Sequence, residues 1–177
     1  MVSINTSPDQ TEDTSSEYYS QILLKNIKHD LINPINAMIG YSELILDTLE
    51  EDKNKVLIKD VQSIYHSSTA ILSILQNLFI ETSKTHDDNI GTLLFNEELH
   101  FAIRTPLSSV IGLSELIIED ILTLSDSSIQ DIQDSVSNIN QAGKGLLRLI
   151  NDISKYSHLP NSDLIERYYT DLYLKES

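Results

Sequence analysis

The 177-residue chain contains no cysteine and no tryptophan. Without cysteine it can form neither a disulfide framework, nor a thiolate zinc site, nor a cysteine nucleophile, and this composition fits a reducing, cytoplasmic compartment. The first 17 residues have neither a basic region nor an apolar stretch, and no run of about 18 apolar residues follows. We therefore expect neither a secretory signal nor a membrane-spanning segment.

Basic residues are also scarce. Twelve Lys and Arg stand against 27 Asp and Glu, which gives a formal net charge of -15. Nucleic-acid backbones and acidic membrane surfaces are bound by clustered Lys and Arg, and no such cluster forms here without acidic neighbours. The charge excludes nucleic acid and argues against a membrane surface as partners, although it does not explain why the chain is so acidic.

Glycine and proline, with five and four residues, leave room for few turns. Leucine and isoleucine are abundant, which is typical of helices that pack through aliphatic side chains. From Tyr18 onward apolar residues recur at spacings of three and four, the pattern of a helix with one buried seam. The members of this first seam are Leu24, Ile27, Leu31, Ile35, Met38, Ser42, Ile45 and Leu49.

A second helical pattern follows a polar break, with Val61, Ile64, Ile71, Leu75 and Leu78. We assign residues 18–84 to a first helical hairpin, preceded by a disordered acidic tail at 1–17. A polar linker at 85–92 leads to a second hairpin at 93–158. Residues 159–177 form a C-terminal tail in which apolar residues at helical spacing predict a short helix.

The two hairpins are an internal repeat. Residues 34–45 and 106–117 are identical at seven of twelve positions at an offset of 72, and residues 64–78 align with 139–153 at an offset of 75. The second copy is thus longer, most plausibly in its interhelical loop. Because a hairpin with one apolar seam cannot bury it alone, we predict an all-α, antiparallel four-helix bundle within one chain, an intramolecular pseudo-dimer. A homodimer is the lesser alternative.

Two prolines, Pro34 and Pro106, lie at matched positions inside the predicted helices. Proline removes a backbone hydrogen bond there, so we expect a helix kink at each. Before the first of them the sequence reads His29, Asp30, then Asn33 and Pro34, and Gly40 follows. This string resembles the phosphoacceptor box of the dimerisation and phosphotransfer (DHp, or HisKA) domain of two-component sensor histidine kinases. Residues 141–153 resemble the second helix of the same domain.

The resemblance implies a role for each residue of the box. His29 is the phosphoacceptor, Asp30 a hydrogen-bond acceptor or general base, and Asn33 the position that orients a water for phosphatase chemistry. The pattern of the residues agrees, because His29 lies off the apolar seam and imidazole is a nucleophile near neutral pH. Asn33 and Lys25 share its helix face.

The second copy departs from the box. Phe101, Ala102 and Thr105 take the places of the histidine, the aspartate and the asparagine, so the second site is degenerate. His100 lies one residue early, about 100° around the helix, and is a weak substitute. We expect one acceptor site per bundle.

These features favour a histidine phosphotransfer protein of a two-component phosphorelay, which shuttles phosphoryl groups between His29 and the aspartates of receiver domains. The alternatives are a receiver-domain phosphatase or a non-catalytic module that binds a response regulator or a histidine kinase. No segment is Gly-rich enough to cradle ATP phosphates, so we expect no autonomous kinase activity. No metal-ligand spacing occurs around His66, His86 or His158; the chain is expected to bind no cofactor, and Mg²⁺ is supplied by the receiver.

Overall fold

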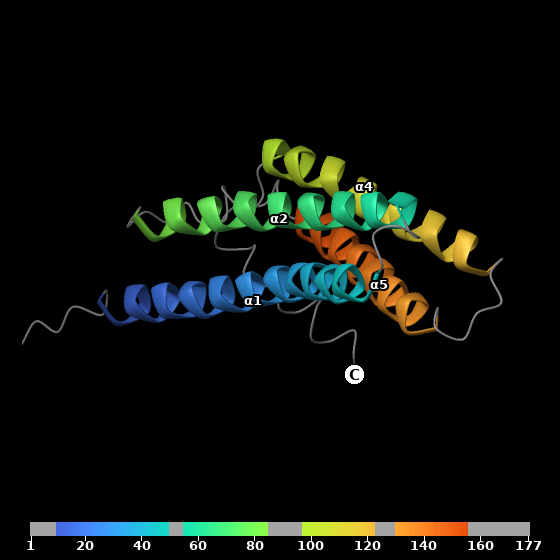
Figure 1. Ribbon diagram of the computed structural model, residues 1–177. Helices are drawn as coiled ribbons and strands as arrows, with labels where there is room; N and C mark the ends of the chain where they lie inside the picture. Colours follow the sequence, from blue (N-terminus) through green and yellow to red (C-terminus); the bar gives the residue numbers. More distant parts are fainter. Residues whose placement is uncertain (1–9, 50–54, 85–96, 123–129, 156–177) are drawn as a thin grey trace, which may run out of the picture.

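The computed structural model describes residues 10–49, 55–84, 97–122 and 130–155. These residues form four helices: α1 (Gln10–Thr48), α2 (Lys55–Lys84), α4 (Glu97–Leu122) and α5 (Gln130–Ser154) (Figure 1). The described part of the chain contains no strand. The all-α class that the sequence predicts is confirmed.

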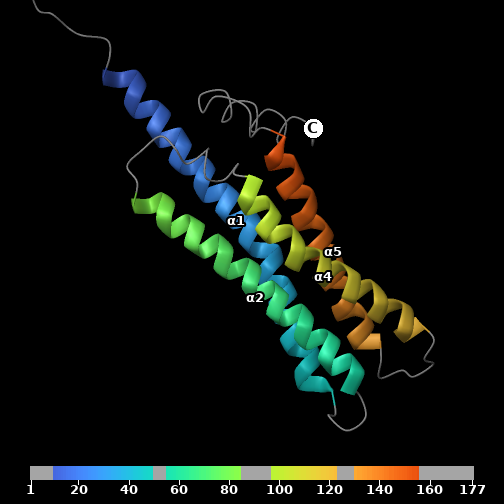
Figure 2. The ribbon, with the colours of Figure 1, turned by 90° about the horizontal axis from the view of Figure 1, so that it is seen from above.

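The helices close into a ring. α1 contacts α2, α2 contacts α4, α4 contacts α5, and α5 returns to α1, so each helix has two neighbours. Figure 2 shows the two hairpins lying side by side along a common direction. The contacts of α1 with α5 and of α2 with α4 join the hairpins, as expected for two copies that bury each other's seams within one chain.

The core follows the predicted seams. All the assigned residues of the second helix are buried, and so are most of those of the first. The apolar residues that are least exposed come from all four helices: Ile35, Met38, Val61, Ile64, Ile71, Leu107, Val110, Val136, Ile139 and Leu146. Gly143 of α5 lies close to α4 and α1, because a Cβ there would lie 3.1 Å from Ile111 Cγ1 and 3.7 Å from Met38 Sδ.

Helix boundaries agree with the repeat. α2 and α5 begin 75 residues apart, which is the offset between the second helices. Two of the three residues added in the second copy therefore lengthen the end of α4, which stops at Leu122 and not at the position 120 that matches Thr48, and the third lies between α4 and α5. The first helix begins at Gln10, earlier than expected at Tyr18, since extending an established helix adds a hydrogen bond for each residue fixed. The predicted linker at 85–92 and the tail at 159–177 lie outside the described residues.

One helix meets the length and composition of a membrane-spanning segment. Residues Glu97–Ile121 of α4 are long and apolar enough to cross a membrane by length and composition alone. No such segment is expected from the sequence, because no uninterrupted run of about 18 apolar residues occurs in it. In the bundle, however, Arg104 donates to Asn151 of α5 and Glu115 pairs with Lys144. Charged side chains near the middle of a helix are costly in lipid, whereas here they are satisfied by a neighbouring helix. The place of α4 in the core explains its buried apolar residues, among them Ile103, Leu107 and Val110.

Candidate phosphoacceptor site

His29 lies on the outer surface of α1. Its side chain is 70% exposed, whereas Ile27 and Leu31 on either side of it are buried in the core. The seam spacing thus directs the imidazole into solvent, as the sequence predicts. An exposed imidazole on a rigid helix is accessible to a macromolecular partner that brings a phosphoryl group.

Two polar neighbours on the same helix contact the ring. Asp30 Oδ1 lies 3.5 Å from His29 Nδ1, and Asn33 Nδ2 lies 3.1 Å from both ring nitrogens. A carboxylate beside Nδ1 favours the tautomer with its proton on that atom, which leaves the lone pair on Nε2. Asn33 can then donate to Nε2. The three residues that the sequence singles out are therefore brought together at one surface.

Lys28 directly precedes His29 on α1, and its side chain reaches toward α2. Its ammonium lies 5.3 Å from the ring centre of Phe79, a buried residue near the end of α2, which is the geometry of a cation–π contact. Lys28 did not figure in the sequence analysis. At the offsets of 72 and 75 Lys28 corresponds to His100 and Phe79 to Ser154.

That equivalent pair is also in contact in the second hairpin. His100 is buried, and its Nδ1 forms a hydrogen bond with Ser154 Oγ of α5. Its burial means that His100 cannot present its ring to a partner on the surface. The weak chance that it replaces the missing acceptor is thereby removed.

The degenerate copy exposes an aromatic ring where the first copy exposes an imidazole. Phe101 is 67% exposed, and Ala102 and Thr105 are exposed beside it. A phenyl ring has no lone pair that can take a phosphoryl group. The two faces therefore have matching positions but different chemistry.

Both helices continue through their prolines, Pro34 in α1 and Pro106 in α4. Their place inside helices is as predicted from the sequence. The kink expected at each of them stays a prediction.

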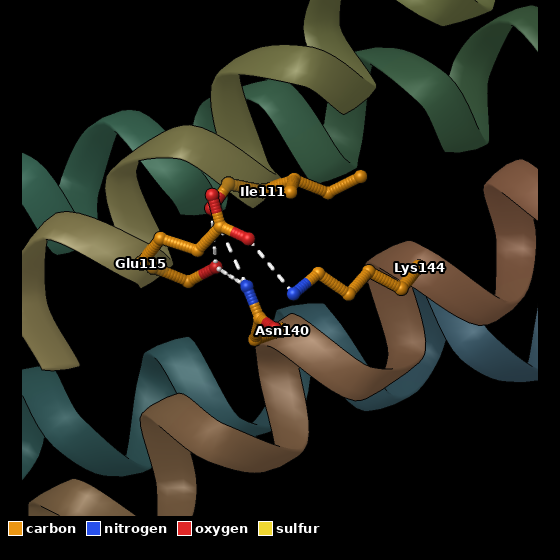
Figure 3. A network of polar contacts seen from close by, with 5 residues as sticks. Ile111, Glu115, Asn140 and Lys144 are labelled. Atoms are coloured by element: carbon orange, nitrogen blue, oxygen red, sulfur yellow. Dashed lines mark hydrogen bonds and ion pairs between the residues drawn. The ribbon is translucent and has the colours of Figure 1, made fainter.

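A polar network joins α4 and α5 within the second hairpin (Figure 3). Asn140 Nδ2 donates to Ser114 Oγ at 2.8 Å and approaches the carbonyl oxygen of Ile111 at 3.4 Å, and both side chains are buried. Nearer the surface, Lys144 Nζ lies 2.8 Å from Glu115 Oε1. The sequence reasoning missed this network, because it depends on how the two helices face each other.

Within the described ranges, no group of three or more His, Asp or Glu side chains is placed to hold a metal ion. His66 lies exposed on α2, with its ring edge-on to that of Tyr65. His86 and His158 lie outside the described residues.

Comparison with known proteins identifies the repeated unit. The family model "His Kinase A (phospho-acceptor) domain" matches twice, over residues 20–85 and 102–161. The chain is 33% identical over 90 residues to "Hybrid signal transduction histidine kinase A" of Dictyostelium discoideum, an alignment that covers 51% of this chain and 4% of that protein. No solved structure matches significantly. With both hairpins matched, the chain belongs to the His Kinase A phosphoacceptor domain family, of which it carries two copies in tandem.

Proposed function

We propose that the chain is a histidine phosphotransfer protein, which receives a phosphoryl group on His29 from a receiver-domain aspartate and passes it to another. Family membership indicates two-component signalling and a phosphoaccepting histidine. The observation that carries the finer proposal is the exposed His29 ring with the Asp30 carboxylate at its Nδ1. The chain spans about 4% of the length of the curated kinase that it matches.

The transfer step follows from the tautomer. With the proton held on Nδ1 beside Asp30, and once the Asn33 amide has moved off Nε2, the Nε2 lone pair attacks the phosphorus of an aspartyl phosphate. The Nε2–P bond forms while the bond from phosphorus to the carboxyl oxygen breaks, and its electron pair returns to the carboxylate. Asp30 stabilises the positive charge that the ring gains. We propose that the receiver supplies the Mg²⁺ that neutralises charge on the transferring oxygens.

Of the two matched faces in the described helices, one carries this set of residues. At the matched face Phe101 replaces the nucleophile and Ala102 replaces the carboxylate. We therefore expect one labile phosphoryl group per chain.

The experiment is transfer of radiolabelled phosphate from isolated receiver domains, charged with acetyl phosphate, to the whole chain. We expect a label on the protein that is stable in base and lost in acid, as for a phosphorus–nitrogen bond. His29→Gln should abolish it. His66→Gln, which alters another exposed histidine, is the matched control and should be labelled like the wild type. Label that survives His29→Gln would refute the assignment.

A second candidate function is dephosphorylation of the receiver, and the position of Asn33 favours it. Its carboxamide lies within hydrogen-bond reach of the His29 ring and can both donate to and accept from a water. Free phosphate released equally by wild type and His29→Gln, but not by Asn33→Ala, would support the phosphatase. If the chain binds receivers tightly and neither accepts label nor releases phosphate, it is a non-catalytic module.

A further inference from the structure

The two matched faces carry opposite charge. Residues 25–33, around His29, contain two lysines and one aspartate, a net charge of +1. Residues 97–105, around Phe101, contain two glutamates and one arginine, a net charge of -1. Lys25 corresponds to Glu97 at the offset of 72. In a chain with a net charge of -15, the positive face is the one that keeps the acceptor.

Both lysines lie within four residues of the acceptor on α1. Lys25 is exposed one helical turn before His29 and shares its face. Lys28 directly precedes His29, and its side chain is held against Phe79. The ring contact restrains the ammonium, which still has three N–H donors for an anion.

Neither lysine is neutralised by a carboxylate among the residues that the structure describes. Lys144 and Lys155, by contrast, pair with Glu115 and Asp152. An unpaired ammonium on an otherwise acidic protein attracts anions, and a phosphoryl group carries a charge of about -1.5 to -2 at neutral pH. Glu97, in the first turn of α4, stabilises that helix terminus, whereas Lys25 lies well inside α1 and has no such helix-end role.

We propose that Lys25 and Lys28 bind the phosphoryl group while it passes to or from His29. The inference rests on the proposed function, since it assigns the residues that hold the group in transit at the same site. Their charge lowers the repulsion that an incoming dianion meets from the acidic surface of the chain. The contact with Phe79 holds Lys28 on the side of α1 that faces α2.

The test uses phosphoramidate, a small phosphoryl donor, with the whole chain. Lys25→Gln and Lys28→Met remove charge and keep length, and the methionine still covers Phe79. We expect the double variant to be labelled about tenfold more slowly at low ionic strength, a difference that narrows at about 0.5 M salt. The single variant Lys28→Arg, which keeps the positive charge, should be labelled at a rate within about twofold of that of the wild type.

Lys59→Gln, a change of an exposed lysine on α2, is the control for net charge and should not alter the rate. Unfolding midpoints, measured for every variant, separate loss of binding from loss of fold. Equal labelling of the double variant and the wild type would overturn the inference, and so would equal slowing by Lys59→Gln. Slowing at both salt concentrations alike would also overturn it, because direct charge attraction is screened.

A parallel arm uses a phosphorylated receiver domain as donor. If no receiver labels the wild type while phosphoramidate labelling depends on Lys25 and Lys28, the phosphorelay role fails and the phosphoryl-binding pair stands. If transfer from the receiver slows in the double variant but phosphoramidate labelling does not, the lysines contact the receiver's surface, and the inference fails. Failure of phosphoramidate to label the wild type would overturn the acceptor role and the inference together.

Discussion

Asn140 of α5 donates a hydrogen bond of 2.8 Å to Ser114 of α4, and both side chains are buried. At the matched position of the first hairpin, Ser42 is equally buried, but its hydroxyl donates to the carbonyl of Met38 in its own helix. Tyr65 takes the place of Asn140 at the offset of 75. The matched serine therefore forms a hydrogen bond between two helices in the second hairpin, whereas in the first hairpin its hydrogen bond stays within its own helix.

This difference predicts unequal effects of the same substitution. Ser114→Ala should destabilise the fold by about 1–3 kcal/mol, since a buried carboxamide loses its best partner. Ser42→Ala should stay within about 0.5 kcal/mol of wild type, because only a hydrogen bond to its own helix is lost. Urea unfolding measures both changes, provided that the dependence of the unfolding free energy on urea concentration is the same for each variant. Equal midpoints for the two variants would contradict the role given to Asn140.

Two glycines two residues apart on α5 should respond in opposite directions. Nothing lies within 4 Å of a Cβ placed at Gly145, so Gly145→Ala should stabilise the helix by about 0.5–1 kcal/mol. At Gly143 a side chain would press on Ile111, and Gly143→Leu should destabilise by about 1–3 kcal/mol. Thermal unfolding checks both. A leucine tolerated at 143 would show that α5 does not approach α4 as closely as described.

The degenerate face should be repairable. Phe101 is exposed, so Phe101→His with Ala102→Asp adds an imidazole and a carboxylate without disturbing the core. In a His29→Gln background we expect phosphoramidate labelling to return, with the label on residue 101. Adding Glu97→Lys should raise the rate further, because it gives the face the charge that Lys25 gives the first. Mass spectrometry of peptides locates the label, and none at residue 101 would show that the faces differ in more than these side chains.

Closure within one chain predicts the mass in solution. Because α1 packs on α5 and α2 on α4, both seams are covered without a second copy. Light scattering should therefore give a mass near 20.0 kDa across concentrations. Twice that mass, or one that rises with concentration, would favour exchange of hairpins between chains.

Much of this architecture could be read from the sequence, because the seams and the repeat are local patterns. Ile35, Met38 and Ile64 are buried where the spacing of three and four puts them, and His29 is exposed for the same reason. What escaped prediction are contacts between helices. Neither the Lys28–Phe79 contact nor the Asn140–Ser114 bond has a signature within one helix, since each depends on the rotation and register of two helices. The early start of α1 also escaped prediction. The polar composition of residues 10–17 predicts disorder, whereas the helix that follows them extends through these residues.

The covalent link between the hairpins has a consequence for how such a bundle responds to its own abundance. A domain that dimerises from separate chains falls apart on dilution and can exchange partners with related chains. Hairpins on one chain meet at an effective concentration set by their connection, of the order of millimolar for a short flexible one, whatever the amount of protein present. The face that carries His29 and the face that carries Phe101 are thus always present in equal number, and pairing with other phosphoacceptor domains has to compete with this effective concentration.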